Sequence, residues 1–241
     1  YKHKPIFYLH SEEKYFPIDL NFIKDCPLMF NSTAIYNEQT KNLTKVHSIN
    51  ASPSILYSTV KFPNIDYRFY IDFKDDKVYG VNPKDWKNGS PNIYAVVKNI
   101  DGYTYVYYIV LYGFNYGKTI LGLQHTGDHY GDLECLIYQY KGQDLQKVYF
   151  SAHSSEDGRW VNSKDLSFDV NGNLLVYVAL GGHANYPNTG VVFRYGGVAN
   201  DKLEKGIEWN PDVKRVYLEN EKDFSIDRDG WIYFGGLFGY N

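Results

Sequence analysis

Residues 103–114, with the sequence YTYVYYIVLYGF, consist almost entirely of aromatic and aliphatic residues. Aromatic and β-branched side chains favour β-strands because they pack well on a pleated, half-buried surface. The turn-forming residues Asp101 and Gly102 come directly before this run. The segment therefore predicts a long strand that follows a tight turn.

Similar runs recur along the chain, with Gly, Asn and Asp turns between them. They are residues 66–73, 77–81, 92–100, 133–140, 147–154, 173–180, 190–195 and 231–240. Only residues 17–28 and 164–168 are expected to form a helical turn or two. Short strands at this spacing predict an all-β fold with long loops and one or two short helices. We expect a single antiparallel β-sandwich, with a barrel as the alternative.

No linker or change in composition interrupts the 241 residues, so we expect one β-sandwich domain over residues 1–241. Residues 71–81, 168–178 and 225–235 each contain an acidic turn before an apolar strand, as propeller blades do. Their unequal spacing favours ordinary hairpin turns over a propeller.

The net charge of −3 argues against a basic surface that binds nucleic acid. No run approaches the roughly 18 apolar residues of a transmembrane helix. The chain begins with Tyr1 and has no charged and apolar leader, which favours a processed or trimmed product. Four Asn-x-Ser/Thr sequons favour a secreted or luminal (including vacuolar) glycoprotein. These candidate glycosylation sites are Asn31, Asn42, Asn50 and Asn88.

The two cysteines, Cys26 and Cys135, permit one disulfide or two free thiols. Cys135 lies in an apolar run, and a small buried cysteine is the more common interpretation of such a position.

The segment HTGDHYGDLEC, residues 125–135, places several ionisable side chains directly before an apolar strand. Strand alternation would put Asp132 and Glu134 on one face, about 7 Å apart, where two carboxylates repel unless a cation or proton lies between them. His129 has the opposite parity, but Gly131 allows a bend that could turn it toward the same point. Such ligands suit Mg²⁺ or Ca²⁺ better than Zn²⁺. The alternative is that the two acids are solvated or cap neighbouring turns.

Four of the histidines, including His125, His153 and His183, lie next to predicted strands. Loops at one end of a sandwich cluster in space, so these histidines could converge with the carboxylates. His125 and His129 are four residues apart, but the Thr-Gly-Asp between them is a poor helix, which argues against a helical zinc pair. We interpret Trp160 as a buried packing anchor rather than as a wall of the site.

Three segments in this order resemble the vacuolar protein sorting-associated protein 62 family. They are residues 127–140 (GDHYGDLECLIYQY), 148–161 (VYFSAHSSEDGRWV) and 172–190 (GNLLVYVALGGHANYPNTG). Residues 4–20, 107–117 and 231–239 are also similar to conserved segments of that family, whereas residues 30–65 match it least. Leu133 stands where the family has Trp, which removes a packing group but no candidate ligand.

More distantly, residues 128–134 (DHYGDLE) resemble the G-H-R-H-D-W-E motif of the necrosis-and-ethylene-inducing-like cytolysins. The resemblance implies that His129, Asp132 and Glu134 bind a divalent cation on a single β-sandwich, at a face that recognises membrane lipid. A further acidic ligand of that family has its nearest counterpart in Asn115. The second histidine of the motif corresponds to Gly131, so the match is partial. His125 and Asp128 become supporting or solvated positions.

Three functions follow from these patterns. The first is a secreted or luminal β-sandwich whose cation organises a tyrosine-rich polar face for a glycan, a lipid headgroup or a protein. The second is a metal-dependent hydrolase with His129, His153 or His183 as general base, although no nucleophile elbow, P-loop or HExxH motif occurs. The third is a structural protein that self-associates through exposed strand edges.

Overall fold

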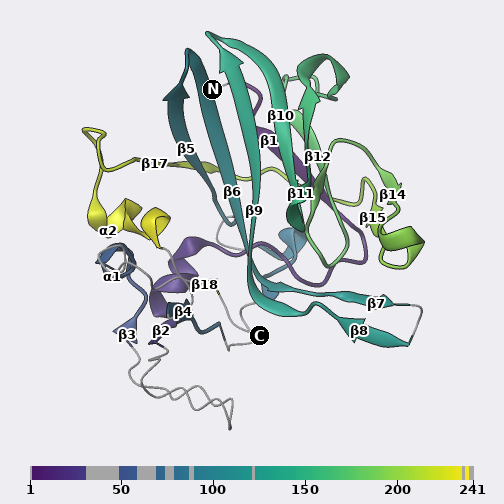
Figure 1. The fold of residues 1–241 in the computed structure, drawn as a ribbon, viewed down its shortest axis with the longest axis horizontal. Helices are drawn as coiled ribbons and strands as arrows, with labels where there is room; N and C mark the ends of the chain where they lie inside the picture. Colours follow the sequence, from purple (N-terminus) through teal and green to yellow (C-terminus); the bar gives the residue numbers. More distant parts are fainter. Residues whose placement is uncertain are drawn as a thin grey trace.

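The computed structural model describes residues 2–30, 49–58, 69–73, 79–86, 90–120, 123–234 and 237–238. Its longest strands form a six-stranded sheet, which we call the central sheet (Figure 1). In spatial order these strands are β11 (Ser154–Asn162), β10 (Asp144–Ala152), β9 (His129–Lys141), β6 (Tyr103–Asn115), β5 (Ile93–Ile100) and β17 (Val213–Val216). The opening run of the sequence is β6, which pairs antiparallel with β5 and β9 and so lies in the middle of this sheet.

A four-stranded sheet covers one face of the central sheet and completes a sandwich. Its strands, in order, are β13 (Asn185–Tyr186), β12 (Leu174–Val178), β1 (Pro5–Leu9) and β16 (Ile207–Trp209). The first core fills the space between the two sheets, where Phe7 and Trp209 meet at 5.0 Å between ring centroids, in the same core as Tyr138 and Phe150. The apolar side chains on alternate positions of each strand supply this core.

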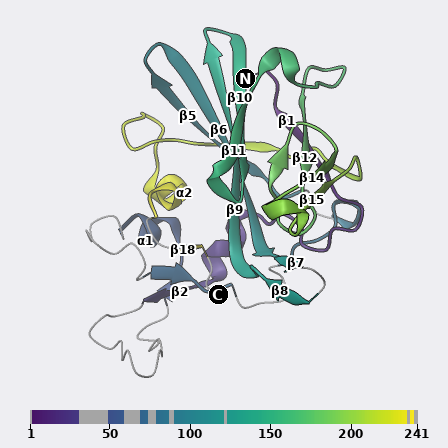
Figure 2. The same ribbon diagram turned by 45° about the vertical axis from the view of Figure 1, so that its right-hand side comes forward.

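The opposite face of the central sheet carries a second core, which packs against short helices and a small sheet. The helices are η1 (Leu20–Asp25), α1 (Pro53–Ser58), α2 (Ile226–Asp229) and η7 (Gly230–Tyr233). The small sheet consists of β18 (Leu237–Phe238), β4 (Phe69–Ile71), β2 (Pro27–Phe30) and β3 (Ile49–Asn50). Figures 1 and 2 both show α1 and α2 on one side of the central sheet and β12 on the other.

The remaining described elements are two short hairpins and three single turns of 3₁₀-helix. They are β7 (Lys118–Ile120) with β8 (Gln124–Thr126), β14 (Gly190–Val192) with β15 (Asp201–Leu203), η4 (Pro83–Asp85), η5 (Ser163–Asp165) and η6 (Tyr195–Gly197). None of the described helices is long and apolar enough to cross a membrane.

The all-β sandwich and the helical turns predicted in residues 17–28 and 164–168 are confirmed. Most strand pairs are antiparallel as predicted, but β1–β12, β5–β17 and β4–β18 are parallel. These pairs join segments far apart in the sequence, and such long connections leave the strand direction free.

One other prediction is wrong. Residues 231–240 do not form one strand, because η7 occupies Gly230–Tyr233. A Cβ at Gly230 would lie 2.5 Å from the Pro53 carbonyl oxygen, so this glycine lets the chain approach α1 closely while Trp231 enters the second core. The sequence left two states of the cysteines open, and in the structure no disulfide joins Cys26 to Cys135. Of the sequons, Asn31, Asn42 and Asn88 lie outside the described residues, and Asn50 lies in β3.

The side-chain alternation of β6 and β9 reverses near their ends. Tyr112 packs in the first core, but Phe114, two residues later, packs against the second core. On β9, Leu136 belongs to the first core and Tyr130 packs against the second. In a regular strand all even-numbered residues lie on one face, so the side-chain alternation of both strands shifts by one residue at this point. The residue pairing between β6 and β9 nevertheless continues without a shift.

Gly131 lies at this reversal on β9, with a φ of +70°. A side chain there would overlap the carbonyl group of Phe238 in β18 and come within 2.7 Å of the Phe73 ring. The reversal turns His129 to the face that carries Asp132, as the sequence predicted from the glycine between them.

We predict that Gly131→Ala lowers the free energy of unfolding by about 2 kcal/mol or more, because it combines left-handed backbone strain with overlap against β18. Gly142→Ala is the matched control, since Gly142 has a φ of +61° and a Cβ there would meet nothing within 4 Å. We expect the control to lose only about 1 kcal/mol in urea unfolding. Equal losses in the two variants would show that the approach of β18 to Gly131 is unimportant.

Candidate functional site

A hollow of about 450 Å³ opens where β9 and β10 separate, and we call it the acidic hollow. The backbone pairing of the two strands ends at Phe150 and Leu136. Beyond this point the Ser151 hydroxyl replaces the backbone, since it accepts the N–H of Cys135 at 2.9 Å and donates to a Glu134 carboxylate oxygen. The separation leaves room for polar side chains from both strands.

The acidic hollow brings together the three residues predicted as metal ligands and two of the predicted supporting residues. Its lining includes His129, Asp132, Glu134, Asn115 and His153. Asn115 and His129 are cross-strand neighbours at the end of the β6–β9 ladder. The Asn115 amide donates to the Gly127 carbonyl at 2.9 Å, whereas the His129 ring forms no hydrogen bond with any described residue. No such bond therefore fixes the orientation of the His129 ring.

His183 holds Asp132 in place and does not act beside it as a second metal ligand. His183 Nδ1 lies 3.1 Å from Asp132 Oδ2, and its Nε2 donates to the Tyr15 carbonyl at 3.0 Å. The fully buried ring also stacks on Tyr112, with 3.8 Å between centroids and 4° between planes. His183 has a φ of +52°, an uncommon backbone conformation for a residue other than glycine. Both ring nitrogens face oxygen atoms, so His183 orients Asp132.

Glu134 is a buried carboxyl group with no cationic side chain bonded to it in the described part of the chain. Burial and the nearby charge of Asp132 raise the pKa of this carboxyl well above its usual value, although the hydrogen bond from Ser151 opposes the shift. The negative charge of Asp201 also raises the pKa of Glu134, by less than the other causes. The group is costly to ionise without a compensating positive charge.

Asp201 in β15 is fully buried too, but positive groups surround it. His153 Nε2 and the Tyr186 hydroxyl both lie 2.8 Å from Oδ2, and Lys118 Nζ lies 3.2 Å from Oδ1. Burial works to raise the pKa of Asp201, but His153, Lys118 and Tyr186 outweigh it and lower the pKa to about 2. His153 is therefore already paired with a carboxylate.

His125 and Asp128 do not line the acidic hollow. His125 Nε2 lies 2.6 Å from Asp128 Oδ1, and the same oxygen accepts the N–H of Gly117 at 2.8 Å. The His125 ring also lies 4.3 Å from the ring of Tyr116. These contacts hold the β7–β8 hairpin to the end of β6.

The acidic hollow has the donor chemistry of a divalent-cation site. Two carboxylates, one imidazole and one amide oxygen suit a hard cation. Among the described residues, however, no three His, Cys, Asp or Glu side chains already converge closely enough to hold a metal ion. Burial and the charge of Glu134 raise the pKa of the Cys135 thiol to about 11, so this thiol is protonated at neutral pH in the absence of a cation. A cation would require the free His129 ring to turn toward the carboxylates.

Sequence analysis missed several residues of this region. Ser151 and Asn185, whose amide donates to the Ser151 hydroxyl at 3.3 Å, lie inside segments that resemble the family, and this resemblance was the available signal. The sequence around Asp201 and Lys118 carries no signal of a buried ion pair. The interpretation of Trp160 as a buried anchor is wrong, since it is 42% exposed on β11 with Lys147 Nζ 4.6 Å from its ring. It lies on β11, the strand at one edge of the central sheet.

We predict that Asp201→Asn lowers the free energy of unfolding at pH 7 by roughly 2 kcal/mol, because a lowering of the Asp201 pKa of this size corresponds to about that free energy. A depressed folded-state pKa stabilises the protein above the unfolded-state pKa of about 4, and this contribution disappears as the pH falls toward about 2. Urea unfolding between pH 2 and 7 measures the effect, and the variant and wild type should converge in acid. A difference that does not change with pH would contradict the ion-pair interpretation.

Comparison with known proteins places these features in a family. The family model described as vacuolar protein sorting-associated protein 62 matches residues 1–228. TDA6 of Saccharomyces cerevisiae is 29% identical over 286 aligned positions, which cover 98% of this chain and 59% of the relative. Vacuolar protein sorting-associated protein 62 of the same yeast is 28% identical, covering 87% of this chain and 50% of the relative. The chain thus spans about half to three fifths of the length of these relatives.

Solved structures with a similar arrangement of strands include the non-toxic HaNLP3 protein, with 8% identity, a TM-score of 0.44 and coverage of 98% of this chain and 80% of that one. Another is necrosis and ethylene inducing protein 2 from the causal agent of cocoa's witches' broom disease, with 9% identity, a TM-score of 0.40 and coverage of 88% and 70%. The family match extends over nearly the whole chain. The chain belongs to the vacuolar protein sorting-associated protein 62 family.

Proposed function

We propose that this chain is a cation-dependent binding module of a secreted or luminal compartment. In this proposal Asp132, Glu134 and His129 hold a divalent cation, with Mg²⁺ or Ca²⁺ favoured over Zn²⁺. The observation that carries it is Glu134, a buried carboxyl whose pKa is raised by burial and by Asp132 and which has no cationic partner in the described residues. The bound cation would supply the positive charge that this pair of acids lacks.

The second element of the proposal is the ligand, for which we favour a glycan, free or as a lipid headgroup. A groove of about 840 Å³ adjoins the acidic hollow, since Gly181 lines the groove and Gly182 lines the hollow. Its wall includes Tyr15 and Tyr116, whose rings stack with 5.5 Å between centroids, and its polar groups include Lys118. Aromatic faces beside hydrogen-bonding groups suit a sugar, which has apolar faces and many hydroxyls.

The hydrolase alternative receives less support from the histidines. His153 pairs with Asp201, and both ring nitrogens of His183 already face oxygen atoms. Of the three bases that the sequence suggested, His129 alone has no partner among the described residues. The third function, self-association through exposed strand edges, is tested by sedimentation of the cation-free protein.

We predict that Glu134→Gln separates stability from cation binding. With chelator present, the variant should be more stable than wild type at pH 7, because the raised pKa of Glu134 destabilises the fold as the pH rises above its unfolded-state value of about 4.3. The two proteins should have similar stability below pH 4, and their difference should grow as the pH rises. Thermal unfolding across this pH range measures it.

Cation addition gives the second half of this test. A cation at about 100 times its Kd should stabilise wild type by about 2.7 kcal/mol and should leave Glu134→Gln unchanged. Asp144→Asn is the matched control, because it removes one exposed carboxylate at the far end of β9–β10. If Ca²⁺, Mg²⁺, Mn²⁺ and Zn²⁺ all leave wild type unchanged, the cation site is refuted.

We further predict that Tyr116→Ala weakens capture of immobilised saccharides at least several-fold, while the thermal response to the cation persists. Tyr103→Ala, at the opposite end of β6, serves as the control and should bind like wild type. A glycan microarray read with and without chelator makes both comparisons. If Tyr116→Ala captures saccharides as well as wild type does, the groove is not the ligand site.

A further inference from the structure

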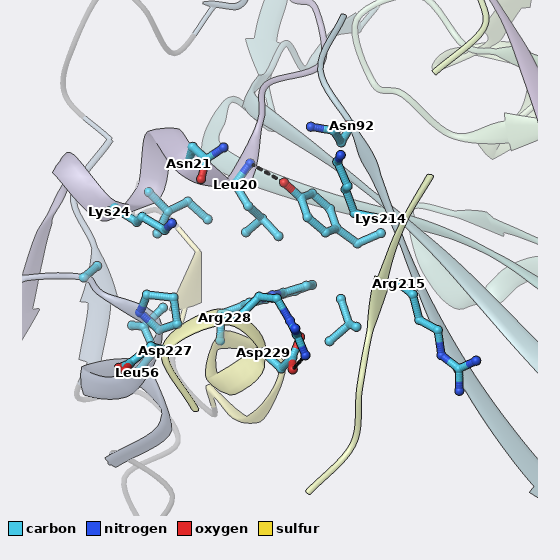
Figure 3. Close-up of a pocket in the computed structure, with 16 residues that line it drawn as sticks. Leu20, Asn21, Lys24, Leu56, Asn92, Lys214, Arg215, Asp227, Arg228 and Asp229 are labelled. Atoms are coloured by element: carbon cyan, nitrogen blue, oxygen red, sulfur yellow. Dashed lines mark hydrogen bonds and ion pairs between the residues drawn. The ribbon is translucent and has the colours of Figure 1, made fainter. Parts of the chain in front are cut away.

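A second cavity, of about 290 Å³, lies within the second core, on the face of the central sheet away from the first core (Figure 3). Five parts of the chain surround it: η1, the start of α1, the start of β5, the end of β17 and the α2–η7 turn. Its apolar lining consists of side chains that are almost fully buried. They are Leu20, Ile23, Ala51, Leu56, Val216 and Trp231.

The size of this cavity exceeds that of a packing defect. It is about twice the roughly 150 Å³ of an engineered apolar cavity that binds benzene. Natural cores leave few voids larger than a water molecule. The cavity therefore has room for an acyl chain or an aromatic group, with an apolar lining to receive it.

Positive charge surrounds the cavity, although the whole chain is negative at −3. Four lining side chains are cationic and two are anionic. They are Lys24, Lys214, Arg215 and Arg228, with Asp227 and Asp229.

Internal partners neutralise only the two arginines. Arg228 binds Asp229 at 2.6 Å, and Arg215, which extends away from the cavity past β17 in Figure 3, binds Glu221 at 2.6 Å. Lys24 and Lys214 form no ion pair with any carboxylate in the described part of the chain. Figure 3 shows Lys24 on the η1 side of the cavity and Lys214 on the β17 side.

Trp231 adds an unused donor to the lining. Its indole N–H forms no hydrogen bond with a described residue and is not enclosed away from solvent. Within a cavity, a ligand oxygen can accept this hydrogen bond.

We propose that this cavity binds an anionic amphiphile, with the apolar tail inside and a carboxylate or phosphate head between Lys24 and Lys214. The buried lining selects the tail because it removes apolar surface from water. The two unpaired lysines select the sign of the head group. This site is separate from the proposed cation site and needs no cation in the acidic hollow.

The test is calorimetric titration with four ligands that share one twelve-carbon tail, each kept below its micelle concentration in buffer that contains chelator. We expect dodecanoate or dodecyl phosphate, or both, to bind at least about tenfold more tightly than dodecanol and dodecyltrimethylammonium. The two anionic ligands distinguish a carboxylate from a phosphate head. Lys24→Gln/Lys214→Gln should weaken anion binding by about tenfold and leave dodecanol unchanged.

Matched variants locate the binding. Lys141→Gln/Lys164→Gln makes the same charge change at exposed positions away from the cavity and should bind dodecanoate as wild type does. Ala51→Leu fills the cavity and should weaken all ligands, and Glu134→Gln should have no effect. In the ¹H–¹⁵N spectrum, dodecanoate should shift the indole resonance that Trp231→Phe removes. No binding, equal binding of the cationic ligand, or equal losses in both lysine pairs would overturn the proposal.

Discussion

The antiparallel pairing of β6 with β9 is the constraint on which the rest of the structure depends. These strands lie in the middle of the central sheet, and each contributes side chains to both cores. Their phase reverses where Gly131 adopts a positive φ beneath β18. Without this reversal His129 would face the second core and would not share the acidic hollow with Asp132 and Glu134. One glycine thus links the fold to the acidic hollow.

The electrostatics of the region follow from unequal compensation of its buried acids. Asp201 has His153, Lys118 and Tyr186 around it, and these groups lower its pKa to about 2. Glu134 has one hydroxyl and a neighbouring carboxylate, so ionisation is costly there. The fully buried His183 ring, which stacks on Tyr112, holds Asp132 in place beside Glu134. A carboxyl pKa strongly perturbed by burial and a neighbouring charge is the physical reason for proposing a binding site here.

Much of this architecture could be predicted from the sequence, because aromatic and β-branched runs such as residues 103–114 and 133–140 report strands directly. The shared face of Asp132 and Glu134 followed from alternation, and the turn of His129 followed from Gly131. The strand predicted over residues 231–240 was wrong because the same apolar composition also suits a buried helical turn. The close contact with α1 decides between these two structures. The pairing of His153 with Asp201 joins segments 48 residues apart, and no local pattern encodes it.

The most direct test of the central claim is a crystal structure of the chain grown with Mn²⁺, with anomalous difference density collected at the manganese edge. The account predicts one strong peak in the acidic hollow, within the 2.0–2.6 Å typical of such ligands from oxygen atoms of Asp132 and Glu134 and from the His129 ring. A map without a peak there, with Glu134 still bonded to Ser151 and His129 unturned, would contradict it.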